Sequence, residues 1–201
     1  MSRGVTAADA LQRLRAGNAR FTANARGSGS LMSAARRAEL AIAQEPFAIV
    51  LGCSDSRVPV EIVFDQGPGD LFVIRVAGNI VAPSLIGSVE FAAERFGTRL
   101  VVVLGHSSCG AIQATLEELR RPTTNQSPNL KDIVDRIRPA VSIGDDESKA
   151  MRANILASVS QLRHGSAIIE GLVDSSGLVV VGAWYSLDTG VVEFLGETLP
   201  A

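Results

Sequence analysis

Residues 100–110 read Leu-Val-Val-Val-Leu-Gly-His-Ser-Ser-Cys-Gly, a short apolar run that ends in polar residues. Continuous runs of this length, rich in Val and Leu, are typical of strands that are covered on both faces in a parallel sheet. The stretch therefore predicts a buried strand over 100–104, with His106 and Cys109 just beyond its carboxyl end. Three further runs have the same character: residues 47–51, 71–76 and 178–182.

Helical patterns separate these strands. Pro83 and Ser84 open an amphipathic stretch that stops at Gly97, as expected for a helical crossover between parallel strands. The turn residues Asp188-Thr-Gly190 link the last apolar runs and predict a terminal hairpin. Further helices are expected at 109–120, 129–141 and 146–163, with a surface loop at 121–128. The pattern as a whole predicts an α/β fold, a mostly parallel central sheet flanked by helices.

The first 45 residues are predicted to be helical. Thr6 is a suitable N-cap with Asp9 three positions later, and a narrow apolar stripe follows. A Gly/Ser/Asn-rich break at 24–30 leads to a second, Ala-rich helix at 31–44, which ends before Pro46. We expect residues 1–45 to form an N-terminal helical extension that lies on another surface, and residues 46–201 to form the α/β domain that carries the site.

Composition excludes several classes of protein. Of the 201 residues, 46% are hydrophobic and 20% charged, so the chain can build a core and is not mainly disordered. The formal net charge is -2 and the 19 Lys and Arg residues are scattered, which argues against nucleic acid as a partner. No apolar stretch approaches the roughly 18 residues that span a bilayer, and no signal-peptide pattern opens the sequence. We expect a cytoplasmic protein without a membrane partner.

The two cysteines, Cys53 and Cys109, both follow predicted strands. Because the carboxyl ends of parallel strands share one edge of the sheet, Cys53, His106 and Cys109 are expected to converge. Two thiolates and an imidazole suit zinc better than magnesium or calcium, and three protein ligands leave the open position of a catalytic zinc. Inert burial of each thiol and a disulfide between them are the alternatives. A disulfide would leave His106 unexplained.

Asp55 and Arg57 follow Cys53 closely and are expected beside the same site. Arg57 can hold Asp55 ionised through a bidentate fork, although a simple Asx-turn beside a solvated arginine is the alternative. Asp55 then either accepts a hydrogen bond from a zinc-bound water or leaves Arg57 and fills the fourth zinc position, which would block the site. Two thiolates neutralise Zn²⁺ formally, so we expect the pKa of such a water to be higher than in an all-histidine site.

The motifs resemble the signatures of the β-class carbonic anhydrases. They are Cys53-Ser-Asp-Ser-Arg-Val-Pro59, Glu90-Phe-Ala92 and Leu100–Gly110, and the similarity extends from Gly17-Asn-Ala-Arg-Phe21 to Gly182–Leu195. The resemblance implies reversible hydration of CO₂ to bicarbonate and a proton, one Zn²⁺ per chain on Cys53, His106 and Cys109, and a catalytic dyad of Asp55 and Arg57. It also implies a homodimer or homotetramer in which the N-terminal helices embrace the partner.

The same resemblance assigns a substrate pocket. Phe72, Ala77 and Phe91 would line an apolar CO₂ pocket, the backbone N–H of Gly110 would face the substrate, and Gln44 would reach the site of a neighbouring subunit. Gln44 can also be an ordinary helix-terminal polar residue, and Phe72 and Phe91 can be ordinary core residues.

One departure from the family concerns regulation. Some members carry an inhibitory bicarbonate site built from a Trp, an Arg and a Tyr. Val50 stands at the Trp position here, although Arg75 and Tyr185 match the other two. We therefore expect no inactivation by bicarbonate. His164, the second histidine, falls at a predicted helix end, where capping is a better explanation than proton transfer.

Two alternative functions remain at this point. One is hydrolysis of CS₂ or COS on the same scaffold. The other is a zinc-binding sensor without turnover, against which Asp55 and Arg57 argue, because a structural zinc prefers four closed protein ligands.

Overall fold

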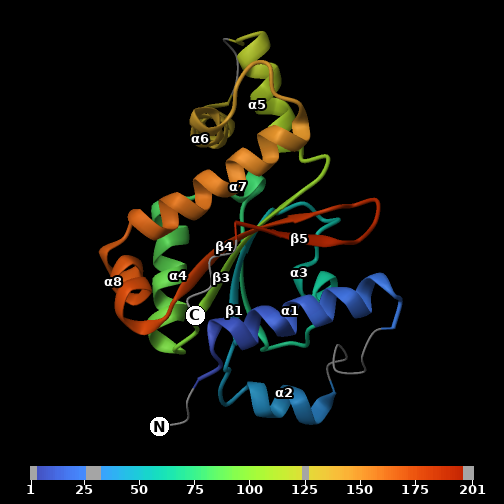
Figure 1. Cartoon of the computed structure of the whole chain (residues 1–201), viewed down its shortest axis with the longest axis vertical. Helices are drawn as coiled ribbons and strands as arrows, with labels where there is room; N and C mark the ends of the chain where they lie inside the picture. Colours follow the sequence, from blue (N-terminus) through green and yellow to red (C-terminus); the bar gives the residue numbers. More distant parts are fainter. Residues whose placement is uncertain (1–3, 26–32, 124–126, 197–201) are drawn as a thin grey trace.

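The computed structural model describes residues 4–25, 33–123 and 127–196. Within them, five strands form one sheet in the order β2-β1-β3-β4-β5 (Figure 1). The strands are β1 (Ala48–Gly52), β2 (Leu71–Arg75), β3 (Leu100–His106), β4 (Val179–Tyr185) and β5 (Val192–Leu195). The first four are parallel and β5 runs antiparallel to β4. The predicted mostly parallel sheet and terminal hairpin are confirmed.

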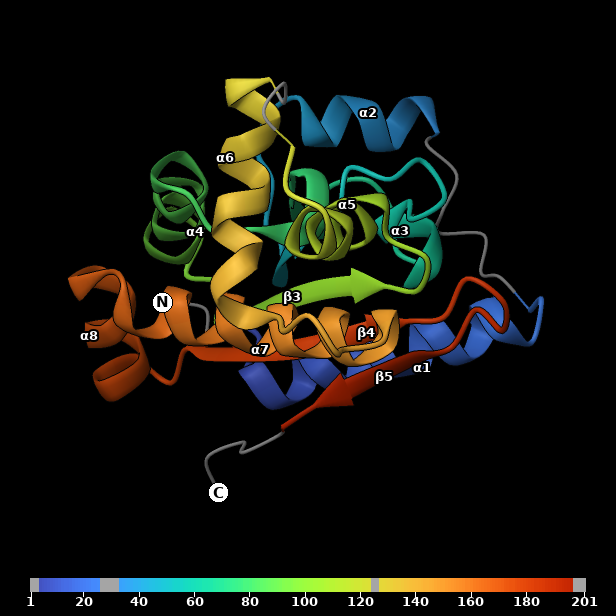
Figure 2. The same ribbon diagram turned by 90° about the horizontal axis from the view of Figure 1, so that it is seen from above.

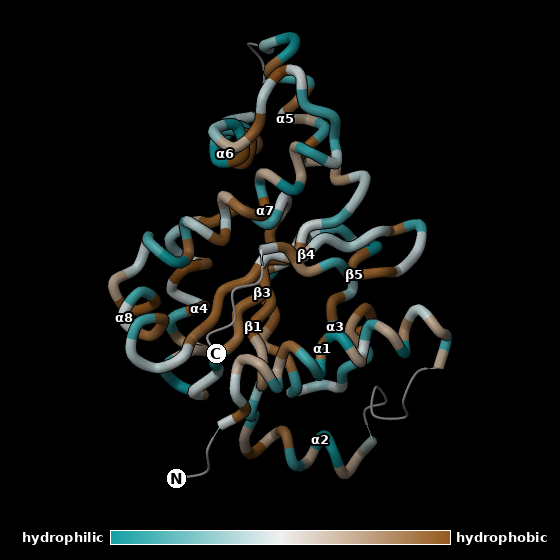
Figure 3. Tube along the Cα trace, in the orientation of Figure 1, coloured by the Kyte–Doolittle hydropathy of each residue, from teal (hydrophilic) through white to brown (hydrophobic). Residues whose placement is uncertain are grey.

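The central strands are buried on both faces. All residues of β1 and β3 are buried, and successive side chains enter two different hydrophobic cores. Ile49 and Leu51 belong to one core, whereas Ala48 and Val50 belong to the other. Figure 3 shows the resulting hydrophobic band along β1 and β3. This two-sided burial explains why the sequence shows continuous apolar runs instead of alternation.

Helices cover both faces of the sheet (Figure 2). The larger core holds side chains from α4 (Pro83–Arg95), α5 (Gly110–Arg120), α6 (Pro128–Ile137), α7 (Glu147–His164) and α8 (Ala167–Ser176). The other core holds side chains from α1 (Ala7–Thr22) and α3 (Val60–Val63). Helix α2 (Ala34–Leu40) has no buried residue. Two short 3₁₀ turns, η2 (Ala77–Asn79) and η3 (Arg138–Ala140), complete the elements.

Helix α1 packs on the sheet of its own chain. Thr6 caps it as predicted, its hydroxyl accepting the N–H of Asp9 at 3.1 Å. The buried side chain of Asn18 donates to the carbonyl of Gly190 at 2.9 Å and accepts the N–H of Val192 at 2.9 Å. The helix is thus tied to the terminal hairpin and shares the core of the α/β domain. Its role as a dimerisation arm stays a prediction.

Several boundaries differ from the sequence prediction. Strands β3 and β4 continue to His106 and Tyr185, because these two residues still pair although the apolar runs have ended. Helix α2 is shorter than the predicted 31–44. Residues 26–32, which include most of the expected break, and residues 124–126 of the expected loop lie outside the described residues.

Two helices were not predicted. Helix α3 is a single turn after Pro59, too short to show periodicity. Helix α8 lies between Ser166, whose hydroxyl accepts the N–H of Ile169 at 3.2 Å, and Gly177, which ends the helix at φ 70°.

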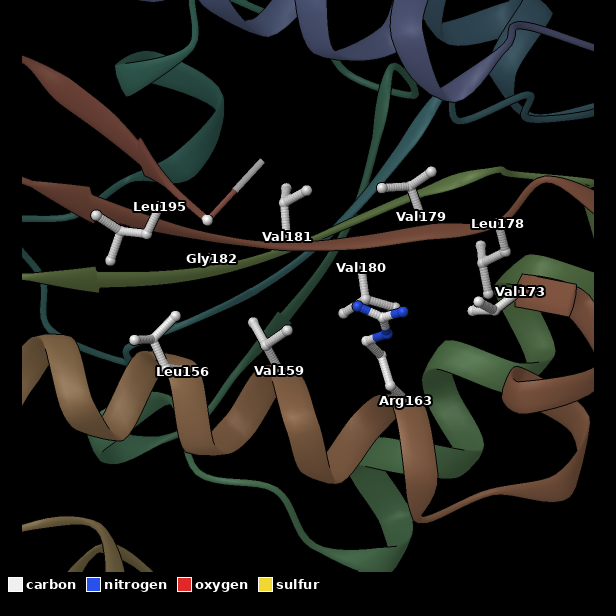
Figure 4. A pocket seen from close by; sticks show the side chains of 11 residues that line it. Leu156, Val159, Arg163, Val173, Leu178, Val179, Val180, Val181, Gly182 and Leu195 are labelled. Atoms are coloured by element: carbon white, nitrogen blue, oxygen red, sulfur yellow. The ribbon is translucent and has the colours of Figure 1, made fainter. Parts of the chain in front are cut away.

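A groove lies between α7, α8 and the first half of β4 (Figure 4). Arg163 is the charged residue among its apolar neighbours, which include Leu156, Val159 and Leu195. The groove borders Val179–Gly182, the amino half of β4, whereas the candidate ligands gather at the carboxyl ends of the strands. In the described part of the chain, no helix combines the length and apolar character needed to cross a membrane.

Candidate metal centre

Three buried side chains meet at the carboxyl edge of the sheet. Cys53 follows β1, His106 ends β3, and Cys109 follows one turn later. One ligand atom from each lies within 4.8 Å of the other two. The parallel register of β1 and β3, with Gly52 opposite Leu104, brings the two loops side by side. We predicted from the sequence that these three side chains converge, and the fold brings them together.

The histidine ring is fixed in one orientation. Its Nδ1 lies 2.8 Å from the carbonyl oxygen of Ser107 and donates to it, so in the neutral ring, the form that binds a metal, Nε2 carries the lone pair. Nε2 is buried and has no hydrogen-bond partner. A buried acceptor without a partner costs free energy, and a metal ion between His106 and the two sulfurs would remove that cost. The residues present therefore fit zinc, which is bound by imidazole nitrogen and thiolate sulfur.

Backbone N–H groups face both sulfurs. The Cys53 sulfur accepts from the N–H groups of Asp55 and Gly78, each at 3.4 Å. Cys109 is the N-cap of α5. The hydrogen bond that it donates to Cys53, together with its burial, raises the pKa of its thiol, and the N–H groups of Ala111 and Ile112 offset only part of this effect. Both cysteines are free thiols, so the two sulfurs do not form a disulfide. The hydrogen bond from Cys109 lowers the pKa of Cys53 well below that of an ordinary thiol, which favours the thiolate that binds metal.

Asp55 and Arg57 form a bidentate pair next to this cluster. The arginine Nη2 lies 2.7 Å from Oδ2 and its Nε lies 3.0 Å from Oδ1, while the backbone N–H of Arg57 also donates to Oδ1 at 2.9 Å. These bonds hold the pKa of Asp55 below its usual range. Oδ2 is 3.9 Å from the His106 Nε2. An ionised carboxylate therefore points toward the place where the three candidate ligands converge.

Arg75 supports the loop that carries Cys53 and Asp55. Its guanidinium donates to the carbonyl of Cys53 at 3.0 Å and to that of Asp55 at 2.6 Å. Val50 and Tyr185 stand at the other two positions of the bicarbonate site that some β-class carbonic anhydrases carry, and both are buried. In this structure Arg75 is thus engaged by the protein backbone.

The predicted pocket residues divide into two groups. Ala77 precedes Gly78, whose N–H donates to the Cys53 sulfur, and Gly110 begins α5 directly after Cys109, so each is the chain neighbour of a residue at the cluster. Phe72 and Phe91 instead contact one another with tilted rings, their centroids 6.2 Å apart, and Phe91 is 53% exposed. Gln44 is exposed and precedes β1, at the opposite end of that strand from Cys53. It takes no part in the cluster of its own chain.

Two contacts to the candidate ligands could not be predicted from the sequence. One is the Gly78 N–H that donates to Cys53, and the other is the Glu147 carboxylate, which accepts the N–H of Cys109 at 3.0 Å. His164 lies in the last turn of α7, its Nδ1 3.6 Å from the Glu170 carboxylate, which agrees with a role at the helix end.

Comparisons with known proteins identify the family of this chain. A family model described as "Carbonic anhydrase" matches residues 48–192. A carbonic anhydrase of Mycolicibacterium smegmatis is 42% identical over 187 residues, covering 90% of this chain and 89% of that protein. The solved β-carbonic anhydrase CcaA is 26% identical with a TM-score of 0.70, covering 92% of this chain and 95% of the other. A tetrameric β-carbonic anhydrase of Sordaria macrospora shares the fold at 24% identity and a TM-score of 0.69, covering 80% and 86%. This chain belongs to the β-carbonic anhydrase family.

Proposed function

We propose that this protein hydrates CO₂ reversibly to bicarbonate and a proton at a zinc ion held by Cys53, His106 and Cys109. The observation that carries the proposal is the set of three buried ligand atoms within 4.8 Å of one another, in a chain of the carbonic anhydrase family. Three protein ligands leave one position of a tetrahedral site open, as in catalytic zinc sites.

Zinc, when bound, supplies the Lewis acidity that lowers the pKa of a water molecule toward neutrality. The chain's own residues do the rest. Asp55 accepts a hydrogen bond from the attacking water and so orients its lone pair. Arg57 keeps Asp55 ionised and in place, and is itself anchored to the carbonyl of Ser108 at 3.0 Å. We also propose that the Gly110 N–H faces the substrate and that Phe72, Ala77 and Phe91 line the CO₂ pocket.

Asp55 has a second proposed position. In a closed resting form it would leave Arg57 and fill the fourth zinc position, which would exclude water. The carboxylate is close enough to the site for this movement, since its Oδ2 lies 3.9 Å from the His106 Nε2. In this structure Asp55 forms its ion pair with Arg57. Hydrolysis of CS₂ or COS and a sensor without turnover have no observation in their favour among the described residues.

The protein is also proposed to be a homodimer or homotetramer. Gln44 is exposed and lies away from the cluster of its own chain, which supports the proposal that it reaches the site of a second copy. The tetrameric Sordaria macrospora protein shares the fold, and its assembly is a property of that protein. A cytoplasmic location stays a prediction from the sequence.

Stopped-flow CO₂ hydration with zinc-loaded wild type and Asp55→Asn tests the function. We expect wild type to be active and the variant to bind zinc equally while losing roughly 100-fold in rate, the lower range for a positioned acid–base group. Asp135→Asn, which removes an exposed carboxylate paired with Lys131, is the matched control and should behave as wild type. A zinc-loaded wild type without activity would favour the sensor, and an unaffected Asp55→Asn would remove Asp55 from the mechanism.

A further inference from the structure

The peptide unit that joins Ser108 to the ligand Cys109 is held at both ends. Its carbonyl oxygen accepts a hydrogen bond from Arg57 at 3.0 Å, and its N–H donates to the Oε1 of Glu147 at 3.0 Å. Ser108 has φ 55°, a left-handed conformation that residues other than glycine rarely adopt. A strained turn therefore presents Cys109, and two charged side chains from distant parts of the chain keep it in that conformation.

Glu147 uses both carboxylate oxygens at the start of α5. Its Oε2 accepts a hydrogen bond from the side-chain amide of Gln113, one turn after Cys109, at 2.9 Å. A carboxylate at a helix N-terminus is favoured by the helix dipole, and hydrogen bonds to an ionised acceptor are stronger than those between neutral groups. Glu147 is thus well suited to hold the Cys109 backbone.

Close packing fixes the helix that carries Glu147. A Cβ atom on Gly105 would lie 2.4 Å from the Met151 sulfur and 2.6 Å from Ile155, so α7 lies directly against β3 beside His106. A shift of α7 along β3 would break this close packing and open a cavity in the core. The contact with the sheet therefore fixes the position of Glu147, the first residue of α7.

The same helix also supports the other cysteine. The Asn154 amide donates to the carbonyl of Gly78 at 2.8 Å, and the N–H of Gly78 donates to the Cys53 sulfur. The spacing from Glu147 to Asn154 is two helical turns, which places both side chains on one face of α7. One face of α7 therefore contacts the surroundings of both candidate thiolate ligands.

We propose that Glu147 is a positioning residue of the metal centre. Its carboxylate fixes the peptide unit between Ser108 and Cys109. That peptide unit in turn positions the Cys109 sulfur and the Ser108 carbonyl oxygen, which holds Arg57. The inference rests on the proposed zinc site and adds to it a residue that neither binds the metal nor touches substrate. Removing hydrogen-bond partners of metal ligands typically costs 10–100-fold in metal affinity.

The test is zinc affinity, measured by competition with a chromophoric chelator for wild type, Glu147→Ala and Glu147→Gln. We expect Glu147→Ala to bind zinc about 10-fold more weakly. Glu147→Gln should recover most of the affinity, because its amide oxygen can still accept the Cys109 N–H. Loading with Co²⁺ gives a second reading: the thiolate-to-cobalt absorption should shift in Glu147→Ala and stay unchanged in the control below.

Asp146→Ala is the matched control. It removes one carboxylate and the N-cap contact to the Lys149 N–H at the same helix start, without touching Cys109. The inference would be overturned if the zinc affinity of Glu147→Ala were within twofold of that of wild type. It would also be overturned if Asp146→Ala lost as much zinc affinity as Glu147→Ala. A wild type that binds no zinc would instead contradict the proposed function, so the two failures are distinguishable.

Discussion

The charge at the candidate centre is set by individual side chains. Cys53 and Cys109 bring two negative charges to Zn²⁺ and neutralise it formally, whereas an all-histidine site leaves the ion its full charge. A water bound beside two thiolates should therefore keep a pKa above the value of roughly 7 known for all-histidine sites. Asp55 does not titrate in this range, because Arg57 holds the pKa of the carboxyl below its ordinary value.

We predict that CO₂ hydration increases from pH 7 to pH 9. The deprotonated water is the reactive form, so its fraction rises as the pH approaches a pKa on the alkaline side of neutrality. Stopped-flow rates at constant ionic strength and constant zinc occupancy measure this dependence. A rate that is flat between pH 6 and pH 9 would contradict the charge argument.

Residues of the site differ in how readily the sequence predicts them. Cys53, His106 and Cys109 were predictable because each lies at the carboxyl end of an apolar run, and parallel strands bring such ends together. Gly78 and Glu147 were not, because they contact the ligands through a backbone amide or from a segment nearly 40 residues away. Nothing local in either stretch marks such a contact.

At the scale of elements, the packing of α7 on β3 links the core to the site. Gly105 is the residue that allows this close approach, with Met151 and Ile155 where a side chain would be. Strands were predictable from their apolar runs, since burial on both faces leaves a strong signal. The single turn of α3 and the helix α8 were not, because short helices held by local caps show little periodicity.

We predict that Gly105→Ala destabilises the protein by about 1–3 kcal/mol, the usual cost of an extra methyl group in a packed core. Displacement of α7 or β3 should also weaken zinc binding, because His106 is the next residue. Urea unfolding of the metal-free protein measures the first effect.

Gly171→Ala, in α8 with open space around the added methyl group, is the control. It should stabilise the protein by about 0.5–1 kcal/mol, since alanine is the better helix former. Equal free energies of unfolding for Gly105→Ala and wild type would show that the contact between α7 and β3 is not tight.

At the scale of the whole molecule, an aromatic cluster includes Phe72 of β2, one of the two edge strands of the sheet. Phe72, Phe91 and Phe96 contact one another, and Phe91 remains 53% exposed in the single chain. Large exposed aromatic side chains near a sheet edge are typical of surfaces covered by another protein. This face is where we expect a second copy of the chain to bind.

We predict that Phe91→Glu shifts the protein to a smaller species in size-exclusion chromatography with light scattering. A buried charge without a partner would disfavour association through this face. Leu130→Glu, on α6 and similarly exposed at 57%, is the control and should leave the molecular mass unchanged. A monomeric wild type, or equal dissociation in both variants, would contradict the assignment.

The most direct test of the central claim is the zinc content of Cys109→Ala, measured beside its CO₂ hydration rate. Cys109 supplies one of the three proposed ligands, and its loss leaves too few protein donors for a stable site. We predict that metal and activity are lost together, while wild type holds one zinc per chain. A Cys109→Ala protein that still holds one zinc per chain would contradict the proposed ligand set.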